Sequence, residues 1–175
     1  MTRIDRGLLL PFLLTLGIIL LDQVTKFLVV AHIEPVYERG FSIEIFGEVF
    51  RLIHARNPGI AFSLGAGFPE PVRRGLFTFF PLVVIGVLFF YYLLHAKEFS
   101  ALERWSVAGI MGGGLGNLID RVFRPEGVVD FLDVKFYGLF GLERWPTFNV
   151  ADASVVVCGM LLVLSILLKE VREKS

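Results

Sequence analysis

The sequence has few of the residues on which many catalytic and binding sites depend, and each shortage excludes a class of function. It contains one cysteine, Cys158, which rules out an intrachain disulfide and a cysteine-bound metal cluster. Its three histidines lack the His-x-x-x-His and His-Glu-x-x-His spacings of metal sites. A formal net charge of +0 offers no basic field for nucleic acid. We therefore expect no metal, no cofactor and no nucleic-acid partner.

Charged residues are also scarce, which indicates a membrane protein. Only 19% of the residues are charged and 55% are hydrophobic, against about 25% and 45–50% in an ordinary soluble domain. The apolar stretches predict one domain over residues 1–175 of the all-α membrane class, with transmembrane helices of the ~20 residues that a bilayer requires. The four predicted spans cover about 7–31, 75–94, 102–123 and 148–168. The first resembles a signal peptide but lacks a clear small-x-small cleavage site, so we interpret it as an uncleaved span.

The segments between the spans predict a small extramembrane structure. Apolar and polar residues alternate between Tyr37 and Ile53, which indicates a short sheet lying on the membrane surface. The aromatic segment Phe136–Pro146 favours an interfacial helix or a lid. Four spans would place both termini on one side, but counting Lys and Arg does not decide which side.

The third predicted span is rich in glycine and ends in polar residues. Gly109 with Gly113, and Gly112 with Gly116, have the four-residue spacing that lets membrane helices pack closely. Asn117 continues the face of Gly113 by one further step of four residues, and Arg121 by another.

Two aspartates form the strongest candidate for chemistry. Asp130 and Asp152 lie on the same side of the membrane, because one loop joins the third span to the fourth. Two close carboxyls share a proton, so one can activate water while the other donates its proton. Three alternatives remain open: Asp152 could cap the fourth span, the acids could serve a proton or ion pathway, or the chain could be a non-catalytic scaffold.

An acidic and a basic residue lie close together on the first span. Asp22 and Lys26 are four residues apart and therefore share a helix face. They could be a pair at the membrane interface, with Lys26 reaching outward, or they could support an active site from below.

Five blocks of the sequence closely resemble the lipoprotein signal peptidases (signal peptidase II), which are bacterial intramembrane aspartic proteases. The blocks occur in the family's order and cover most of the chain. They are Leu21–Lys26, Asn57–Phe62, Gly113–Arg121, Val128–Phe131 and Phe148–Asp152. The connection before the last block is longer than is usual in the family.

The resemblance implies a function and a set of site residues. The expected reaction removes the signal peptide from diacylglyceryl-modified prolipoproteins, on the N-terminal side of the lipid-modified cysteine. Asp130 and Asp152 would be the catalytic pair. The residues expected to line the site or bind substrate are Asn57, Gly59, Asn117, Arg121, Asn149 and Ala151, and those expected to support it are Asp22, Lys26 and Asp120.

The resemblance also implies a location and partners. The site would lie near the periplasmic face of the bacterial inner membrane, with both termini in the cytoplasm. The expected partners are prolipoproteins, membrane lipids and cyclic peptide inhibitors of the globomycin type.

Overall fold

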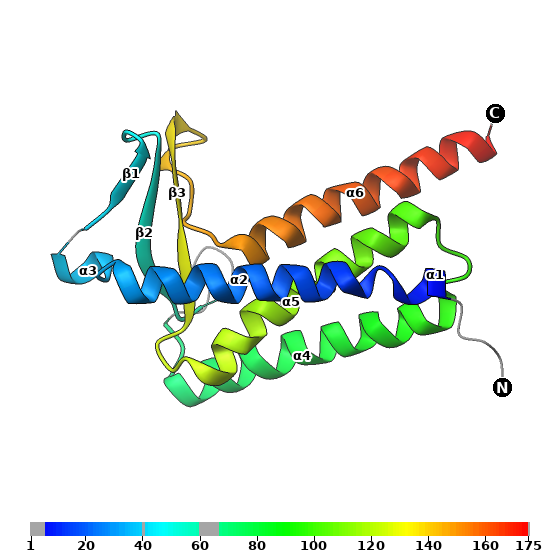
Figure 1. The fold of residues 1–175 in the computed structure, drawn as a ribbon, viewed down its shortest axis with the longest axis horizontal. Helices are drawn as coiled ribbons and strands as arrows, with labels where there is room; N and C mark the ends of the chain where they lie inside the picture. The colour runs from blue at the N-terminus through cyan, green and yellow to red at the C-terminus, as the bar shows by residue number, and fades with distance from the viewer. Residues whose placement is uncertain (1–5, 40, 60–66, 175) are drawn as a thin grey trace.

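The computed structural model describes residues 6–39, 41–59 and 67–174, and it consists of a helical bundle with a small sheet across one end (Figure 1). The helices are α1 (Arg6–Leu9), α2 (Phe12–His32), α3 (Val36–Arg39), α4 (Glu70–His95), α5 (Ala101–Phe123) and α6 (Val150–Glu173). The strands are β1 (Ile43–Phe46), β2 (Phe50–Asn57), β3 (Val128–Leu139) and β4 (Leu142–Arg144).

Three helical segments in the described part of the chain are long and apolar enough to cross a membrane. They are Gly7–His32, Glu70–His95 and Val150–Arg172, with mean hydropathies of 2.0, 2.3 and 2.4. The expectation of four apolar spans is therefore corrected to three. The helix α5 is of similar length, but it has small residues where a lipid-facing span would have large apolar ones, because it packs among α2, α4 and α6.

The glycines of α5 make this central position possible. A Cβ atom on Gly112 would lie 3.1 Å from the backbone of Thr15 in α2, and one on Gly114 would lie 3.0 Å from Ile85 in α4. A Cβ on Gly113 would overlap the carbonyl oxygen of Ala151 in α6. Three successive glycines thus face three different helices, which confirms that they serve close helix packing.

The sheet is antiparallel, with strand order β1-β2-β3-β4, and its strands run across the ends of the long helices (Figure 1). The all-α class is therefore wrong, although the sheet predicted from the alternation before Ile53 is confirmed. A cluster of buried residues joins β3 to the end of α2 and fixes the sheet on the bundle. It comprises Val29, Ile33, Val129 and Phe131.

The segment 136–146 is not an interfacial helix. It contains the hairpin that joins β3 to β4, in which Gly138 and Gly141 adopt φ angles of +76° and +78°. Glycine reaches this left-handed region without steric cost, so the chain turns here instead of continuing as a helix. The hairpin is held to β2 by Asp133, whose carboxylate accepts hydrogen bonds from Arg51 and Arg144 at 2.6 Å each.

Candidate active site

Asp130 lies in β3, between the buried side chains of Val129 and Phe131, and is 4% exposed. Its neighbours in the strand pack against α2, so the sheet itself holds the carboxyl over the end of the bundle. Oδ1 accepts a hydrogen bond from Nδ2 of Asn149 at 2.7 Å, and Oδ2 accepts one from Nδ2 of Asn57 at 3.2 Å. Both donors are neutral amides, and neither neutralises the carboxylate.

Asp152 lies in the first turn of α6, where Asn149 is the N-cap residue. The side chain of Asn149 accepts from the backbone N–H of Asp152 at 2.9 Å, and the Asp152 carboxylate accepts from the backbone N–H of Asn149 at 3.1 Å. This reciprocal arrangement is a capping box. Asp152 therefore does help to cap the helix, but only through Oδ2. Its Oδ1 accepts instead from Nδ2 of Asn117 at 2.7 Å.

Asn149 connects the two carboxyls directly. Its side-chain amide donates to Asp130, and its backbone N–H donates to Asp152. The same amide donates to Oδ1 of Asn117 at 3.0 Å, which draws α5 into the arrangement. One fully buried asparagine thus places a strand carboxyl and a helix carboxyl around a common centre.

The pKa of Asp130 reflects this environment. Burial raises it from the ordinary value of 3.8 to about 7, and the negative charge of Asp152 adds to the increase. The hydrogen bonds from Asn57 and Asn149 and the charge of Lys26 act in the opposite direction but are smaller. Asp130 therefore keeps its proton up to a higher pH than an ordinary aspartate, which suits general acid–base chemistry.

A second group of polar residues is linked to this pair through Asn117, and we call it the support cluster: Asp22, Gln23, Lys26 and Asp120. The ammonium group of Lys26 is 2.8 Å from Asp22 and 3.0 Å from Asp120, and all three side chains are fully buried. An outward-reaching Lys26 is therefore excluded. Lys26 also donates to Oδ1 of Asn117 at 2.9 Å, which connects the support cluster to the pair of Asp130 and Asp152, which we call the dyad.

The support cluster also holds the backbone on which each candidate catalytic residue is carried. Oδ1 of Asp22 accepts from the N–H of Ala151 at 3.0 Å, one residue before Asp152. Oδ2 of Asp120 accepts from the N–H of Val129 at 3.0 Å, one residue before Asp130. Asp22 therefore does for α6 what Asp120 does for β3: each binds the backbone N–H of the residue just before a candidate catalytic aspartate.

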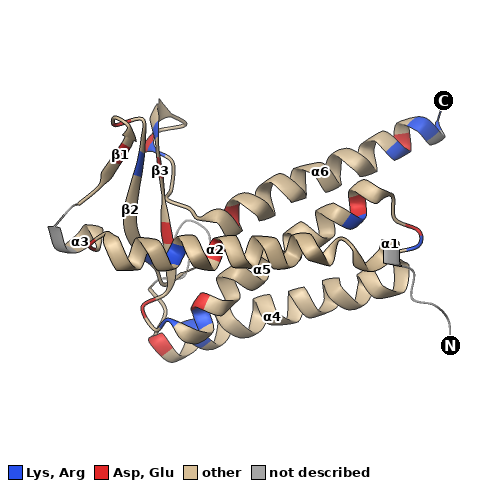
Figure 2. Cartoon of the chain, viewed as in Figure 1, with Lys and Arg blue, Asp and Glu red and all other residues tan. Residues whose placement is uncertain are grey.

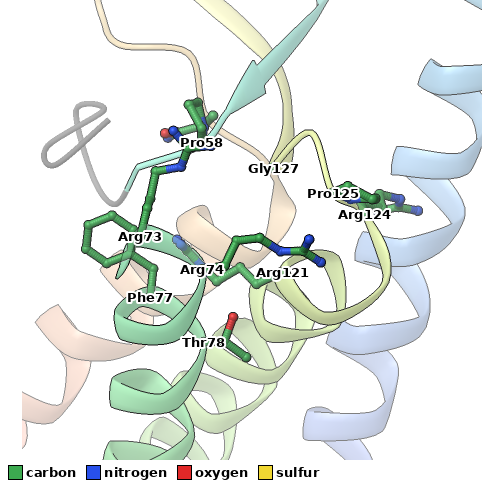
Figure 3. Close-up of a pocket in the computed structure, with 10 residues that line it drawn as sticks. Pro58, Arg73, Arg74, Phe77, Thr78, Arg121, Arg124, Pro125 and Gly127 are labelled. Carbon is green, nitrogen blue, oxygen red and sulfur yellow. The ribbon is translucent and has the colours of Figure 1, made fainter. Parts of the chain in front are cut away.

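Arg121 defines one side of the site. Its guanidinium donates to the carbonyl of Gly59 at 2.9 Å and lies over the ring of Phe77, 5.8 Å from the centroid. Figure 3 shows the narrow pocket at this side, which is lined by Asn57 and several arginines. The arginines are Arg73 and Arg74 of α4, Arg121 of α5 and Arg124, which caps α5. They give the approach to Asn57 a positive character.

All eleven residues expected at the site belong to one connected network. Asp130 bonds to Asn57, whose side-chain oxygen accepts from the N–H of Gly59 at 3.0 Å, and Gly59 bonds in turn to Arg121. The remaining residues are joined through Asn149, Asn117 and Lys26, as described above. Of the block Asn57–Phe62, positions 60–62 lie outside the described residues.

Two residues of the network were missed by the sequence analysis. Nε2 of Gln23 lies 3.0 Å from Asp22 and from the carbonyl of Gly116, and 3.1 Å from Asp120. Arg124 forms an ion pair with Asp120. The position of Arg124, four residues after Asp120 on one helix face, was a usable signal. Gln23 gave none beyond its place beside Asp22.

Metal ligation has no candidate in the part of the chain that the structure describes. There, no three His, Cys, Asp or Glu side chains are grouped so that they could hold an ion.

Comparisons with known proteins identify a family. The profile of the family described as Signal peptidase (SPase) II matches residues 14–168. A lipoprotein signal peptidase of Treponema denticola is 50% identical, over 95% of this chain and 93% of that protein. One from Treponema pallidum is 41% identical, over 97% and 89%. A solved structure of a bacterial membrane enzyme has a TM-score of 0.77 at 26% identity and covers 94% of this chain and 91% of its own.

Proposed function

The chain belongs to the signal peptidase II family, and from this premise we propose that it is an intramembrane aspartyl endopeptidase of prolipoproteins. The substrate carries a diacylglyceryl group on a cysteine, and the enzyme cleaves on the N-terminal side of that cysteine. The whole chain, residues 1–175, acts as one peptidase domain. The observation that carries the proposal is the buried link from Asp130 through Asn149 to Asp152.

The two carboxyls divide the work of hydrolysis. Asp130 holds the proton of the pair, as its raised pKa supports, and Asp152 is the carboxylate that takes a proton from water. The resulting hydroxide attacks the scissile carbonyl, and the tetrahedral intermediate collapses as Asp130 gives its proton to the leaving nitrogen. The proton on Asp152 then restores the pair. No covalent intermediate is required.

The other residues position the carboxyls or the substrate. Asn117 and Asn149 orient the pair through their amides. Arg121 has donors left to bind a substrate carbonyl beside Gly59, and Asn57 lines the same pocket. Ala151 is fully buried against α5, so its contribution to the site is to set the position of Asp152. Asp22, Lys26 and Asp120 support the site by fixing the backbone before each catalytic residue.

We place this protein in the bacterial inner membrane. The start of α1 and the end of α6 lie at the end of the bundle away from the sheet (Figure 1). We assign this end to the cytoplasm, as the family resemblance implies, which puts the carboxyls near the periplasmic face. The apolar faces of the helices contact membrane lipids and the acyl chains of the substrate, since burying each CH₂ contributes about 0.8 kcal/mol. A globomycin-type cyclic peptide would compete with the substrate for the site.

Cleavage of a diacylglyceryl-modified prolipoprotein by two variants tests the proposal. Asp130→Asn and Asp152→Asn should each lower the cleavage rate by at least the 10²–10⁴-fold that general acid–base groups typically contribute. Glu48→Gln is the matched control, because it removes a carboxylate from the exposed turn between β1 and β2. Full proteolysis by either aspartate variant would contradict the assignment. Ion flux in liposomes that both substitutions abolish would favour a relay instead.

A further inference from the structure

A second cavity lies between the start of α5 and the end of α6, at the opposite end of the bundle from the dyad. Its volume is about 400 Å³, within the range of small-molecule sites. In Figure 1, the C-terminal part of α6 stands apart from the start of α5 at this end. The lining residues are Ser100, Leu102, Glu103, Ser165, Leu168, Lys169 and Arg172, and we call this space the α5–α6 cavity.

The inner polar residues of the cavity satisfy one another. The hydroxyls of Ser100 and Ser165 lie 3.2 Å apart, one on each side. The buried carboxylate of Glu103 accepts the backbone N–H of Ser100 at 2.6 Å, in a capping box that begins α5. This part of the cavity is therefore built from fixed groups, and Glu103 is already engaged.

The outer part carries two cations, Lys169 and Arg172. Lys169 and Arg172 are three residues apart on α6, so they share a face. Neither forms an ion pair with any described residue, whereas neighbouring Glu170 lies 3.9 Å from Lys174. With Glu103 offsetting one of the two cations, the cavity lining has a net charge of +1.

We propose that the α5–α6 cavity binds the headgroup of an anionic phospholipid, with the phosphodiester between Lys169 and Arg172. Both cations lie at the end of an apolar span, where Figure 2 shows charged residues at the C-terminal end of α6, and this is the depth at which a bilayer presents its phosphates. A phosphodiester carries one negative charge, which matches the net charge of the lining. Leu102 and Leu168 provide an apolar wall for the start of the acyl chains. A zwitterionic headgroup adds a cation that the two basic side chains repel.

This lipid site does not depend on the peptidase proposal, because no residue of the dyad network lines it. It requires only that α6 spans the membrane. Loss of binding in the experiment below would leave cleavage by Asp130 and Asp152 untouched.

The experiment measures lipid binding to the full-length protein in detergent by native mass spectrometry. Phosphatidylglycerol should bind more tightly than phosphatidylcholine with the same acyl chains. The double variant Lys169→Gln/Arg172→Gln should weaken phosphatidylglycerol binding about thirty-fold, since each basic residue near anionic lipid contributes about five-fold. Binding of phosphatidylcholine should not change.

The matched control is Lys97→Gln/Lys174→Gln, which removes two charges from the same end of the bundle but outside the cavity lining. It should retain phosphatidylglycerol binding within about two-fold. Equal weakening by both double variants would overturn the site, as would equal binding of the two lipids by the unsubstituted protein. A third arm adds inorganic phosphate alone. Tight phosphate binding that is lost only in Lys169→Gln/Arg172→Gln would show a free-anion site and also overturn the lipid proposal.

Discussion

The dyad and the support cluster each contain two aspartates, yet their partners differ in charge. Asp22 and Asp120 share the ammonium group of Lys26 at 2.8 and 3.0 Å. Asp130 and Asp152 instead accept hydrogen bonds mainly from uncharged asparagine amides. The ammonium group of Lys26 therefore offsets the charge of the support cluster, whereas no cation is hydrogen-bonded to Asp130, and the charge of Asp152 raises the pKa of Asp130 further. The same residue type thus becomes structural or reactive according to the charge of its donors.

The two clusters are close enough to depend on each other. Asn117 accepts from Lys26 through Oδ1 and donates to Asp152 through Nδ2, at 2.9 and 2.7 Å. Through Asn117, the position of Lys26 therefore helps to fix the position of Asp152. Substitutions that change a donor's charge, or remove this connection, test whether the difference between the clusters is real.

Removing the cation from the support cluster should have the largest effect. Lys26→Met leaves Asp22 buried without its counter-charge and Asp120 with Arg124 alone, so we expect a loss of about 3–5 kcal/mol in the free energy of unfolding. Chemical denaturation in detergent measures the loss. The control adds Asp22→Asn to Lys26→Met, which removes the stranded charge and should recover part of the stability. An unchanged unfolding midpoint in Lys26→Met would mean that the ion pairs do not hold the bundle together.

Asp130→Asn, a substitution in the dyad, should raise the free energy of unfolding instead of lowering it, and the size of this effect should depend on pH. Folding raises the pKa of Asp130 from 3.8 to about 7, so the folded protein binds more protons than the unfolded chain between these values. Its stability therefore falls as pH rises from about 4 to about 7, by up to about 4 kcal/mol from this group. Asp130→Asn removes this pH dependence. The stability of the variant relative to the unsubstituted protein should therefore increase as the pH rises from about 4 to about 7.

Thermal unfolding of the two proteins at about pH 4.5, 6 and 8 checks this difference. Asp133→Asn serves as a comparison, because the Asp133 carboxylate is bound by two arginines. It should be destabilising at neutral pH, where Asp130→Asn should stabilise. Parallel stability curves for Asp130→Asn and the unsubstituted protein would mean that Asp130 ionises normally.

The sequence predicts that several of the expected site residues lie close together, but it does not predict their contacts. The face shared by Gly113, Asn117 and Arg121 follows from helical periodicity, and the loop between the last two long helices requires Asp130 and Asp152 to lie on one side. Periodicity cannot indicate that Asn149 is the residue that bonds to both carboxyls. That contact depends on the packing of β3 against the start of α6.

The errors in the predicted fold have physical causes. The helix α5 lies inside the bundle, so glycine replaces the apolar side chains by which a lipid-facing span is recognised. The segment after Val134 has the aromatic content of an interfacial helix, but Gly138 and Gly141 turn it into a hairpin. Whether Lys26 reaches outward or inward could not be decided until Asp120, far away in the sequence, was placed beside it.

Breaking the connection between the clusters should have an intermediate effect. Asn117→Ala removes an acceptor from Lys26 and a donor from Asp152, so we expect a loss of about 2–3 kcal/mol, as for hydrogen bonds to charged groups. A double-mutant cycle with Lys26→Met should give a coupling energy of about 0.5–3 kcal/mol. Asn117→Ala should also slow cleavage, because Asp152 loses the donor that orients Oδ1. Additive effects in the cycle would contradict a direct connection.

The smallest effect should come from Gln23, the neutral member of the support cluster. Its amide is shared among Asp22, Asp120 and the carbonyl of Gly116 at 3.0–3.1 Å. Because Lys26 still compensates both carboxylates, Gln23→Met should cost only about 1–2 kcal/mol and leave the cleavage rate almost unchanged. Thr25→Ala is the control on the same helix, since its hydroxyl bonds only within α2, to the carbonyls of Leu21 and Asp22. A loss in Gln23→Met as large as that in Lys26→Met would mean that the amide, and not the ammonium charge, distinguishes the support cluster from the dyad.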